Sequence, residues 1–178
     1  MILLIGGASH TGKTLLARRL VERTGFSCLS LDLLKMGLIR SGFTALTPED
    51  DEALTGLLWP IAREMIRTAL ENEQDLIVEG VYIPPAWRDG FRPEELAQIR
   101  CRFLVMMEDY IRHHFADIRD WASVVEKRLD DSGCTLEGVL EDNRSCLARC
   151  HRCDMLLIDG EYAVDWVPEV PLKENERS

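Results

Sequence analysis

Residues 7 to 14 read Gly7-Ala8-Ser9-His10-Thr11-Gly12-Lys13-Thr14 and match the pattern G-x-x-x-x-G-K-[ST] at every position. The wholly apolar residues 2–5 come directly before this stretch, as expected for a strand buried on both faces. Residues 14–23 follow with leucines at a helical period. An incidental glycine-rich turn is the alternative, but the strand before and the helix after favour a phosphate-binding loop.

Each residue type in this loop has a physical role in holding a triphosphate. The glycines let the backbone wrap around the β-phosphate, and the amides of the loop and of the helix N-terminus supply positive potential. Lys13 is expected to reach the β- and γ-phosphates and Thr14 to ligate Mg²⁺, so we expect ATP and Mg²⁺ as cofactors. The predicted nucleotide-binding set is Gly7, Ala8, Ser9, His10, Thr11, Gly12, Lys13, Thr14 and Leu15.

Further apolar runs alternate with helical patterns along the rest of the chain. Strands are predicted at residues 27–31, 75–79, 102–107 and 155–159, and helices at 33–39, from a cap at Thr47 to about 72, from 111 to 129 and from 135 to 151. Pro60 is expected to kink or restart the second of these helices. The alternation predicts an α/β fold with three layers, α/β/α, around a five-stranded parallel sheet.

Length and charge limit the possible organisation and partners. The 178 residues are 46% hydrophobic, which suits one core, so we predict one domain over residues 1–167 and a tail at 168–178. The formal net charge of −10 disfavours nucleic acid as a partner. No apolar run is long enough for a membrane span or a signal peptide, which predicts a cytoplasmic protein without membrane association.

The six cysteines are expected to be free thiols. Cys150 and Cys153 have the C-x-x-C spacing of zinc ligands, and Cys146 lies near them. A second pair with this spacing is missing, and Cys150 falls on the apolar face of the predicted helix at 135–151. We therefore favour a buried cysteine over a zinc ligand.

Two further stretches resemble the small P-loop kinases, the group of adenylate kinase, shikimate kinase, 2-phosphoglycerate kinase and chloramphenicol phosphotransferase. Residues 31–35, Leu-Asp-Leu-Leu-Lys, are similar to the segment that opens the acceptor-binding helix of adenylate kinase, with lysine in place of arginine. Residues 77–80, Ile-Val-Glu-Gly, are similar to the acidic residue and glycine that close the third strand in that family. The resemblance implies acceptor contacts by Asp32, Lys35, Glu79 and Gly80. Arg40 lies five residues beyond Lys35 in the short helix after Asp32, and these two side chains could contact an anionic acceptor group or could face water.

The two carboxylates in these stretches each allow two interpretations. Asp32 follows a predicted strand at the edge where α/β sheets bind ligands, so it could orient or deprotonate an acceptor hydroxyl. It could equally cap the helix that begins after it. Glu79 could hold Mg²⁺ through water or orient the acceptor, or it could be an ordinary carboxylate at the end of a strand.

A kinase also needs cations over the transferred phosphate, commonly on a mobile lid. The predicted lid covers residues 108–134, where Arg112 and Arg119 lie seven residues apart on one side of a helix. Arg112 could instead pair with Glu108 or Asp109, whereas Arg119 has no carboxylate three or four residues away. Both arginines are candidate catalytic residues with Lys13 and Asp32.

These features predict an ATP-dependent phosphotransferase that moves the γ-phosphate to a hydroxyl or phosphate of a small molecule. The alternative is a nucleotide-dependent regulatory ATPase or switch that acts on a protein partner. The chain length favours the first, because the core and the lid use up nearly all of the 178 residues.

Overall fold

The computed structural model describes residues 1–125, 134–166 and 168, and within them five strands form one parallel sheet in the order β2-β3-β1-β4-β5. The strands are β1 (Ile2–Gly7), β2 (Ser27–Ser30), β3 (Leu76–Glu79), β4 (Ile99–Met106) and β5 (Met155–Ile158). The helices are α1 (Lys13–Thr24), α2 (Leu31–Arg40), α3 (Asp51–Glu71), α4 (Pro93–Leu96), α5 (Glu108–Val125) and α6 (Leu136–Arg149), with a 3-10 helix at Arg152–Asp154.

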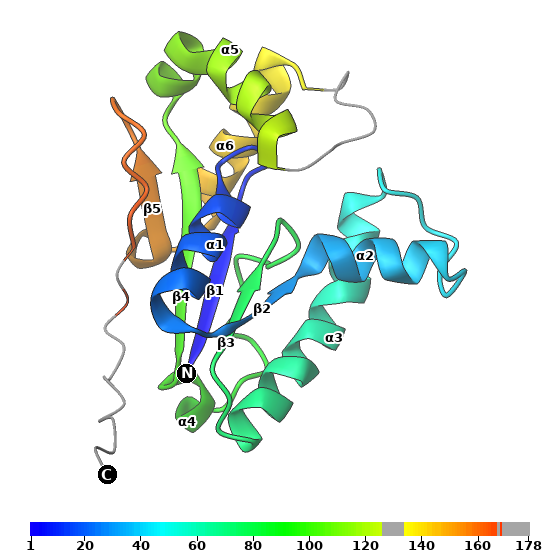
Figure 1. Ribbon diagram of the computed structural model, residues 1–178. Helices are drawn as coiled ribbons and strands as arrows, with labels where there is room; N and C mark the ends of the chain where they lie inside the picture. Colours follow the sequence, from blue (N-terminus) through cyan, green and yellow to red (C-terminus); the bar gives the residue numbers. More distant parts are fainter. Residues whose placement is uncertain (126–133, 167, 169–178) are drawn as a thin grey trace.

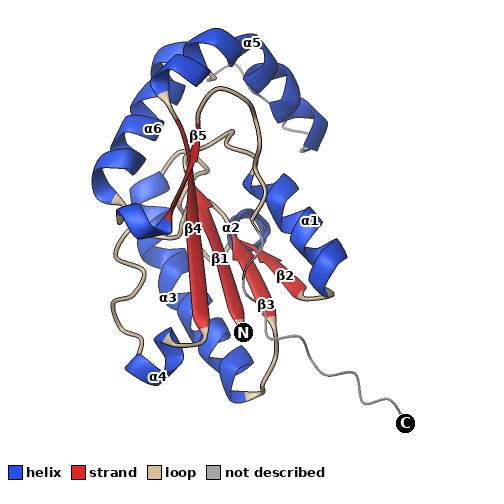
Figure 2. Cartoon of the chain, turned by 90° about the vertical axis from the view of Figure 1, so that its left-hand side faces the viewer, coloured by secondary structure: helices blue, strands red, loops and turns tan. Residues whose placement is uncertain are grey.

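The central strand β1 is buried on both faces, which explains its unbroken apolar sequence. Ile2 and Leu4 pack in one core cluster, which includes the buried face of α3. Leu3 and Ile5 pack in a second cluster with residues of α1, α5 and α6. The sheet therefore lies between two helical layers, and Figure 2 shows the strands side by side with helices around them. The predicted three-layer α/β/α fold is confirmed.

All strands point the same way, so their carboxyl ends meet at one edge of the sheet, away from the N-terminus marked in Figure 1. In the register of the sheet, Ile5 of β1 lies beside Glu79 of β3, and Ser30 of β2 lies on the other side of Glu79. This edge carries the loop after β1 and the start of α2.

The predicted starts of three helices are wrong, since α5 begins at Glu108 instead of residue 111 and two others also differ. Helix α2 begins at Leu31 instead of residue 33. Helix α3 begins at Asp51, and its N-cap is Asp50 instead of Thr47. The Asp50 carboxylate accepts hydrogen bonds from the Thr47 amide and hydroxyl, at 2.7 and 2.9 Å, and so closes a turn before the helix.

Pro60 does not end or restart α3, which continues through it as one helix. The Pro60 ring is exposed, while Leu58 and Ala62 on either side of it are buried in the same core cluster. Core packing thus holds the helix together across the proline. Strand β4 begins three residues earlier than predicted, because the exposed Arg100 interrupts an otherwise apolar run.

Among the residues that the structure describes, no helix is both long enough and apolar enough to cross a membrane. The part of the predicted lid at residues 126–133 lies outside the described residues, as does the tail from residue 169 on.

Candidate functional site

The loop after β1 needs glycine at two positions for steric reasons. Gly7 and Gly12 have φ angles of 122° and 83°, which disfavour other residues. A Cβ atom on Gly7 would collide with the backbone of Leu104 in β4, and one on Gly12 would collide with the hydroxyl of Tyr162. The loop is therefore closely enclosed, and Gly12 turns the chain directly into α1, whose first amides face the loop.

Lys13 lies over this loop with only 7% of its surface exposed. Its Nζ donates a hydrogen bond to the carbonyl oxygen of Ala8 at 2.6 Å, and the Thr11 hydroxyl donates to the same oxygen at 2.9 Å. The Tyr162 hydroxyl donates to the carbonyl of Thr11 at 3.1 Å. The ammonium group is thus held at the loop by local contacts, at the position that the sequence motif requires of it.

Glu79 lies at the carboxyl end of β3 and turns its carboxylate toward the start of α1. The Thr14 hydroxyl donates to Glu79 Oε2 at 3.2 Å. The side chain is 2% exposed, and among the described residues Glu79 Oε1 has no hydrogen-bond partner. Burial raises the pKa of Glu79, as does the charge of Asp32, while hydrogen bonds from Ser30 and Thr14 and the charge of Lys13 oppose the rise.

These features of Glu79 and Thr14 fit a hard divalent cation. A buried carboxylate oxygen without a partner, next to a threonine hydroxyl, offers the oxygen ligands that Mg²⁺ prefers, directly or through water. A cation there would also offset the cost of burying the charge of Glu79.

Asp32 does not cap α2, because Ser30 occupies the N-cap position and Asp32 lies in the first turn. Its carboxylate forms an ion pair with Lys35 Nζ at 3.0 Å and is 37% exposed. The charge of Asp32 raises the pKa of Glu79, so the two carboxylates lie near the same edge of the sheet. Of the two interpretations of Asp32, the cap is wrong, and the acceptor role stays a prediction.

Lys35 links Asp32 to a residue that the sequence did not point to. Its Nζ donates to the Tyr82 hydroxyl at 2.9 Å, and that hydroxyl donates to Asp51 Oδ1 of α3 at 3.1 Å. Burial opposes the charge of Lys35, yet the bonds to Tyr82 and Asp32 raise its pKa. Burial raises the pKa of Tyr82 to about 12. At neutral pH Lys35 is therefore charged and Tyr82 is neutral, in a chain of contacts that runs from Asp32 through Lys35 and Tyr82 to Asp51.

The two other predicted acceptor residues have different surroundings. Gly80 has a φ of 151°, and a Cβ atom there would lie 2.8 Å from the Cβ of Leu31, so the glycine lets β3 pass close to α2. Arg40 is exposed in the last turn of α2, five residues beyond Lys35. Their contacts with an acceptor stay predictions.

In the predicted lid, Arg112 donates through Nε and Nη2 to Glu108 Oε1, at 2.9 and 2.7 Å, as the alternative interpretation expected. Arg144 of α6 donates to the other oxygen of Glu108 at 2.8 Å, so Glu108 ties α5 to α6. Arg119 is exposed, and its Nε lies 3.9 Å from Asp120 Oδ1, next to it in the chain. Contact of either Arg112 or Arg119 with phosphate stays a prediction.

Comparison with known proteins agrees with this architecture. No protein-family model and no curated protein matches the sequence. Among solved structures, the Pnkp1/Rnl/Hen1 RNA repair complex matches with a TM-score of 0.50 and 14% identity, over 84% of this chain and 46% of that chain. The chain has a three-layer α/β/α fold in which the phosphate-binding motif lies between β1 and α1.

Two other structures with weaker superposition are a gluconokinase from Sinorhizobium meliloti 1021 and a shikimate kinase from Aquifex aeolicus vf5. The first is 16% identical and covers 89% of this chain and 81% of its own, and the second is 14% identical and covers 90% and 87%, each with a TM-score of 0.48. At such identities the similarity concerns the fold, so the chemistry depends on this chain's own residues.

Helix α6 brings two side chains near the phosphate-binding loop that sequence reasoning did not assign to the site. Burial raises the pKa of Asp142, the charge of Asp51 raises it further, and the charge of Lys13 lowers it. Cys146 is close enough to the loop to accept a hydrogen bond from the amide of Ala8. Both positions lie more than 120 residues from the loop in sequence, so no local pattern could have identified them.

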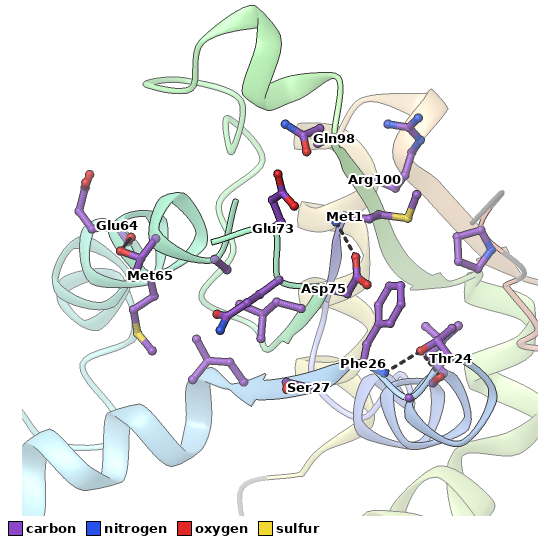
Figure 3. Close-up of a pocket in the computed structure, with 18 of the residues that line it drawn as sticks. Met1, Thr24, Phe26, Ser27, Glu64, Met65, Glu73, Asp75, Gln98 and Arg100 are labelled. Carbon is purple, nitrogen blue, oxygen red and sulfur yellow. Dashed lines mark hydrogen bonds and ion pairs between the residues drawn. The ribbon is translucent and has the colours of Figure 1, made fainter. Parts of the chain in front are cut away.

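A cavity of about 1830 Å³ lies at the opposite end of the sheet, where the strands begin (Figure 3). Met1, Phe26 and Met65 line it, together with Asp75, whose carboxylate pairs with the N-terminal ammonium at 2.8 Å. None of the residues of the phosphate-binding loop lines this cavity. It is therefore separate from the candidate site.

Proposed function

We propose that this protein is an ATP-dependent phosphotransferase that moves the γ-phosphate to a hydroxyl or phosphate of a small molecule, with Mg²⁺ as cofactor. The observation that carries the proposal is the contact between Thr14 and the buried Glu79 beside Lys13, with Asp32 at the same edge of the sheet. A nucleotide-binding loop, a place for a cation and a carboxylate on the acceptor side are the parts that phosphoryl transfer requires.

On the nucleotide side, the loop amides and Lys13 would bind the β- and γ-phosphates. Thr14 and Glu79 would hold Mg²⁺, which neutralises charge as it develops on the phosphate oxygens. The enclosure of the loop by Tyr162 and β4 keeps these donors in place before the nucleotide arrives, so they need no rearrangement during the reaction.

On the acceptor side, Asp32 would orient the attacking hydroxyl and accept its proton. Its partial exposure leaves room for the acceptor to approach. The ion pair with Lys35 would hold the carboxylate in place, and the contact of Lys35 with Tyr82 fixes the ammonium group in turn. The acceptor then binds between α2 and the phosphate-binding loop.

Transfer of label from γ-labelled ATP to a panel of metabolites and antibiotics tests this proposal. We expect one class of acceptor to become labelled with Mg²⁺ present, and we expect Asp32→Asn to abolish most of that labelling. If ATP is hydrolysed without transfer to any acceptor and a protein partner accelerates the hydrolysis, the chain is a regulatory ATPase or switch, and the phosphotransferase proposal fails.

A further inference from the structure

Two cysteines meet where α6 ends against the phosphate-binding loop. The Sγ atoms of Cys146 and Cys150 lie 3.5 Å apart. Cys146 is in the last turn of α6, and Cys150 is its C-cap, whose amide donates to the Cys146 carbonyl at 3.0 Å. Cys150 has an extended backbone conformation instead of a helical one, so the direction of its side chain is not set by the helix.

The environment of the two sulfurs makes them chemically unequal. The hydrogen bond with Cys150 lowers the pKa of the Cys146 thiol, and Lys13, the Ala8 amide and Arg149 lower it further, against the effect of burial. That same hydrogen bond and burial raise the pKa of Cys150, which is 8% exposed. Cys146 is thus the nucleophile, and Cys150 holds the proton and can resolve an oxidised partner.

We propose that Cys146 and Cys150 form a reversible dithiol–disulfide site that hydroperoxides oxidise and that a nucleotide in the adjacent loop protects. The protection rests on the proposed function, because the Ala8 amide and Lys13 serve both the Cys146 sulfur and the phosphates. The disulfide itself requires only the approach of the two sulfurs, which must close from 3.5 Å to a bond of about 2.05 Å.

The reaction balances with a hydroperoxide as the only added reagent. The Cys146 thiolate attacks one peroxide oxygen, an S–O bond forms as the O–O bond breaks, and the released oxyanion takes up a proton. The Cys150 sulfur then attacks the Cys146 sulfur, the S–O bond breaks, and water leaves with the Cys150 proton. Two thiols lose two protons and two electrons in all, and a dithiol reductant reverses the change.

Peptide mapping tests the pairing, because trypsin cuts after Arg149, between the two cysteines. After peroxide treatment and alkylation, we expect residues 145–149 and 150–152 as one disulfide-linked species that disappears on reduction. Cys150→Ser should abolish this species, and Cys28→Ser, which alters an exposed cysteine on β2, should leave it intact. A link to Cys101 or Cys153 instead, or two free thiols at Cys146 and Cys150, overturns the proposal.

The protection is measured as the rate of disulfide formation with and without saturating Mg²⁺-ATP. A bound triphosphate competes for Lys13 and places negative charge beside Cys146, which reduces its thiolate fraction, so we expect the rate to fall by about tenfold or more. An unchanged rate with nucleotide bound refutes the protection. Calorimetry separates the two proposals: if Mg²⁺-ATP does not bind, the proposed function and the protection fail, while the peptide map still decides the thiol pair.

Discussion

Glu79→Gln removes the charge of a carboxylate that the structure buries beside Thr14. The amide is nearly the same size and can still accept the Thr14 hydrogen bond, so the packing of β3 is kept. If Glu79 holds Mg²⁺, its loss should weaken binding of Mg²⁺-ATP by about 10- to 100-fold, the usual effect of removing a partner around a metal site. That range equals about 1.4 to 2.7 kcal/mol at 25 °C.

The same substitution should stabilise the protein when nucleotide and metal are absent. Because the folded-state pKa of Glu79 is raised, the folded protein binds its proton more tightly than the unfolded chain does. The ordinary pKa of a glutamate is 4.5, and the parent protein loses stability as the pH rises from that value through the raised pKa of folded Glu79. The Gln variant has no charge at this position and avoids this loss. The advantage of the variant should grow with pH and then stay constant once Glu79 is fully ionised.

Calorimetry with and without Mg²⁺ measures the first effect, and thermal unfolding from about pH 5 to about pH 7.5 measures the second. Glu73→Gln is a matched control, since Glu73 is exposed just before β3, at the end opposite the site, and should change neither quantity. The reasoning is refuted if Glu79→Gln binds Mg²⁺-ATP as tightly as the parent protein. It also fails if the variant is less stable at neutral pH.

Three further substitutions or measurements test other parts of the site. Lys13→Ala should remove most triphosphate affinity and all turnover in calorimetry and activity assays, yet the chain should stay folded, because the hydrogen bond to Ala8 that is lost contributes about 1 kcal/mol. Asp32→Asn should lower transfer by about 10² to 10⁴, with ATP affinity within a factor of about three, and transfer at the parent's rate would exclude Asp32 as the base. Protein purified without added metal should contain no stoichiometric zinc by elemental analysis, and one zinc per chain would contradict the thiol pairing of Cys146 and Cys150.

The fold could be predicted because its signals are local. Three signals lie within the first 24 residues: the apolar run of β1, the glycines of the loop and the helical period of α1. Each of them indicates one kind of structure and no other. The other strands have weaker signals, since β3 and β5 are apolar runs of three or four residues, β4 contains two arginines, and β2 is the partly exposed Ser-Cys-Leu-Ser. The predicted start of α3 was wrong because a polar side chain sets it. The Asp50 carboxylate accepts a hydrogen bond from the Thr47 amide and so forms a turn before the helix.

The acceptor side could be predicted only in part, because its residues come together through tertiary contacts. Tyr82 lies 47 positions from Lys35 and 31 from Asp51, and no sequence period connects them. Asp32 was found through its place after a strand, whereas its partner Lys35 was expected either to contact an anionic acceptor group or to face water. A lysine three residues after an aspartate in a first turn is itself a signal for an ion pair within the helix.

The charges around the loop explain how a protein with a net charge of −10 can bind a polyanion. The charge of Lys13 lowers the pKa of two carboxylates, Glu79 and Asp142, while the negative charges of Asp32 and Asp51 raise them. One ammonium group and the loop amides do not neutralise both these carboxylates and a triphosphate. A divalent cation beside Thr14 and Glu79 changes this balance, because it attracts the carboxylates and the phosphates together. We infer that metal-free ATP binds weakly here, and that the acidic edge makes the metal a condition of nucleotide binding as well as of transfer.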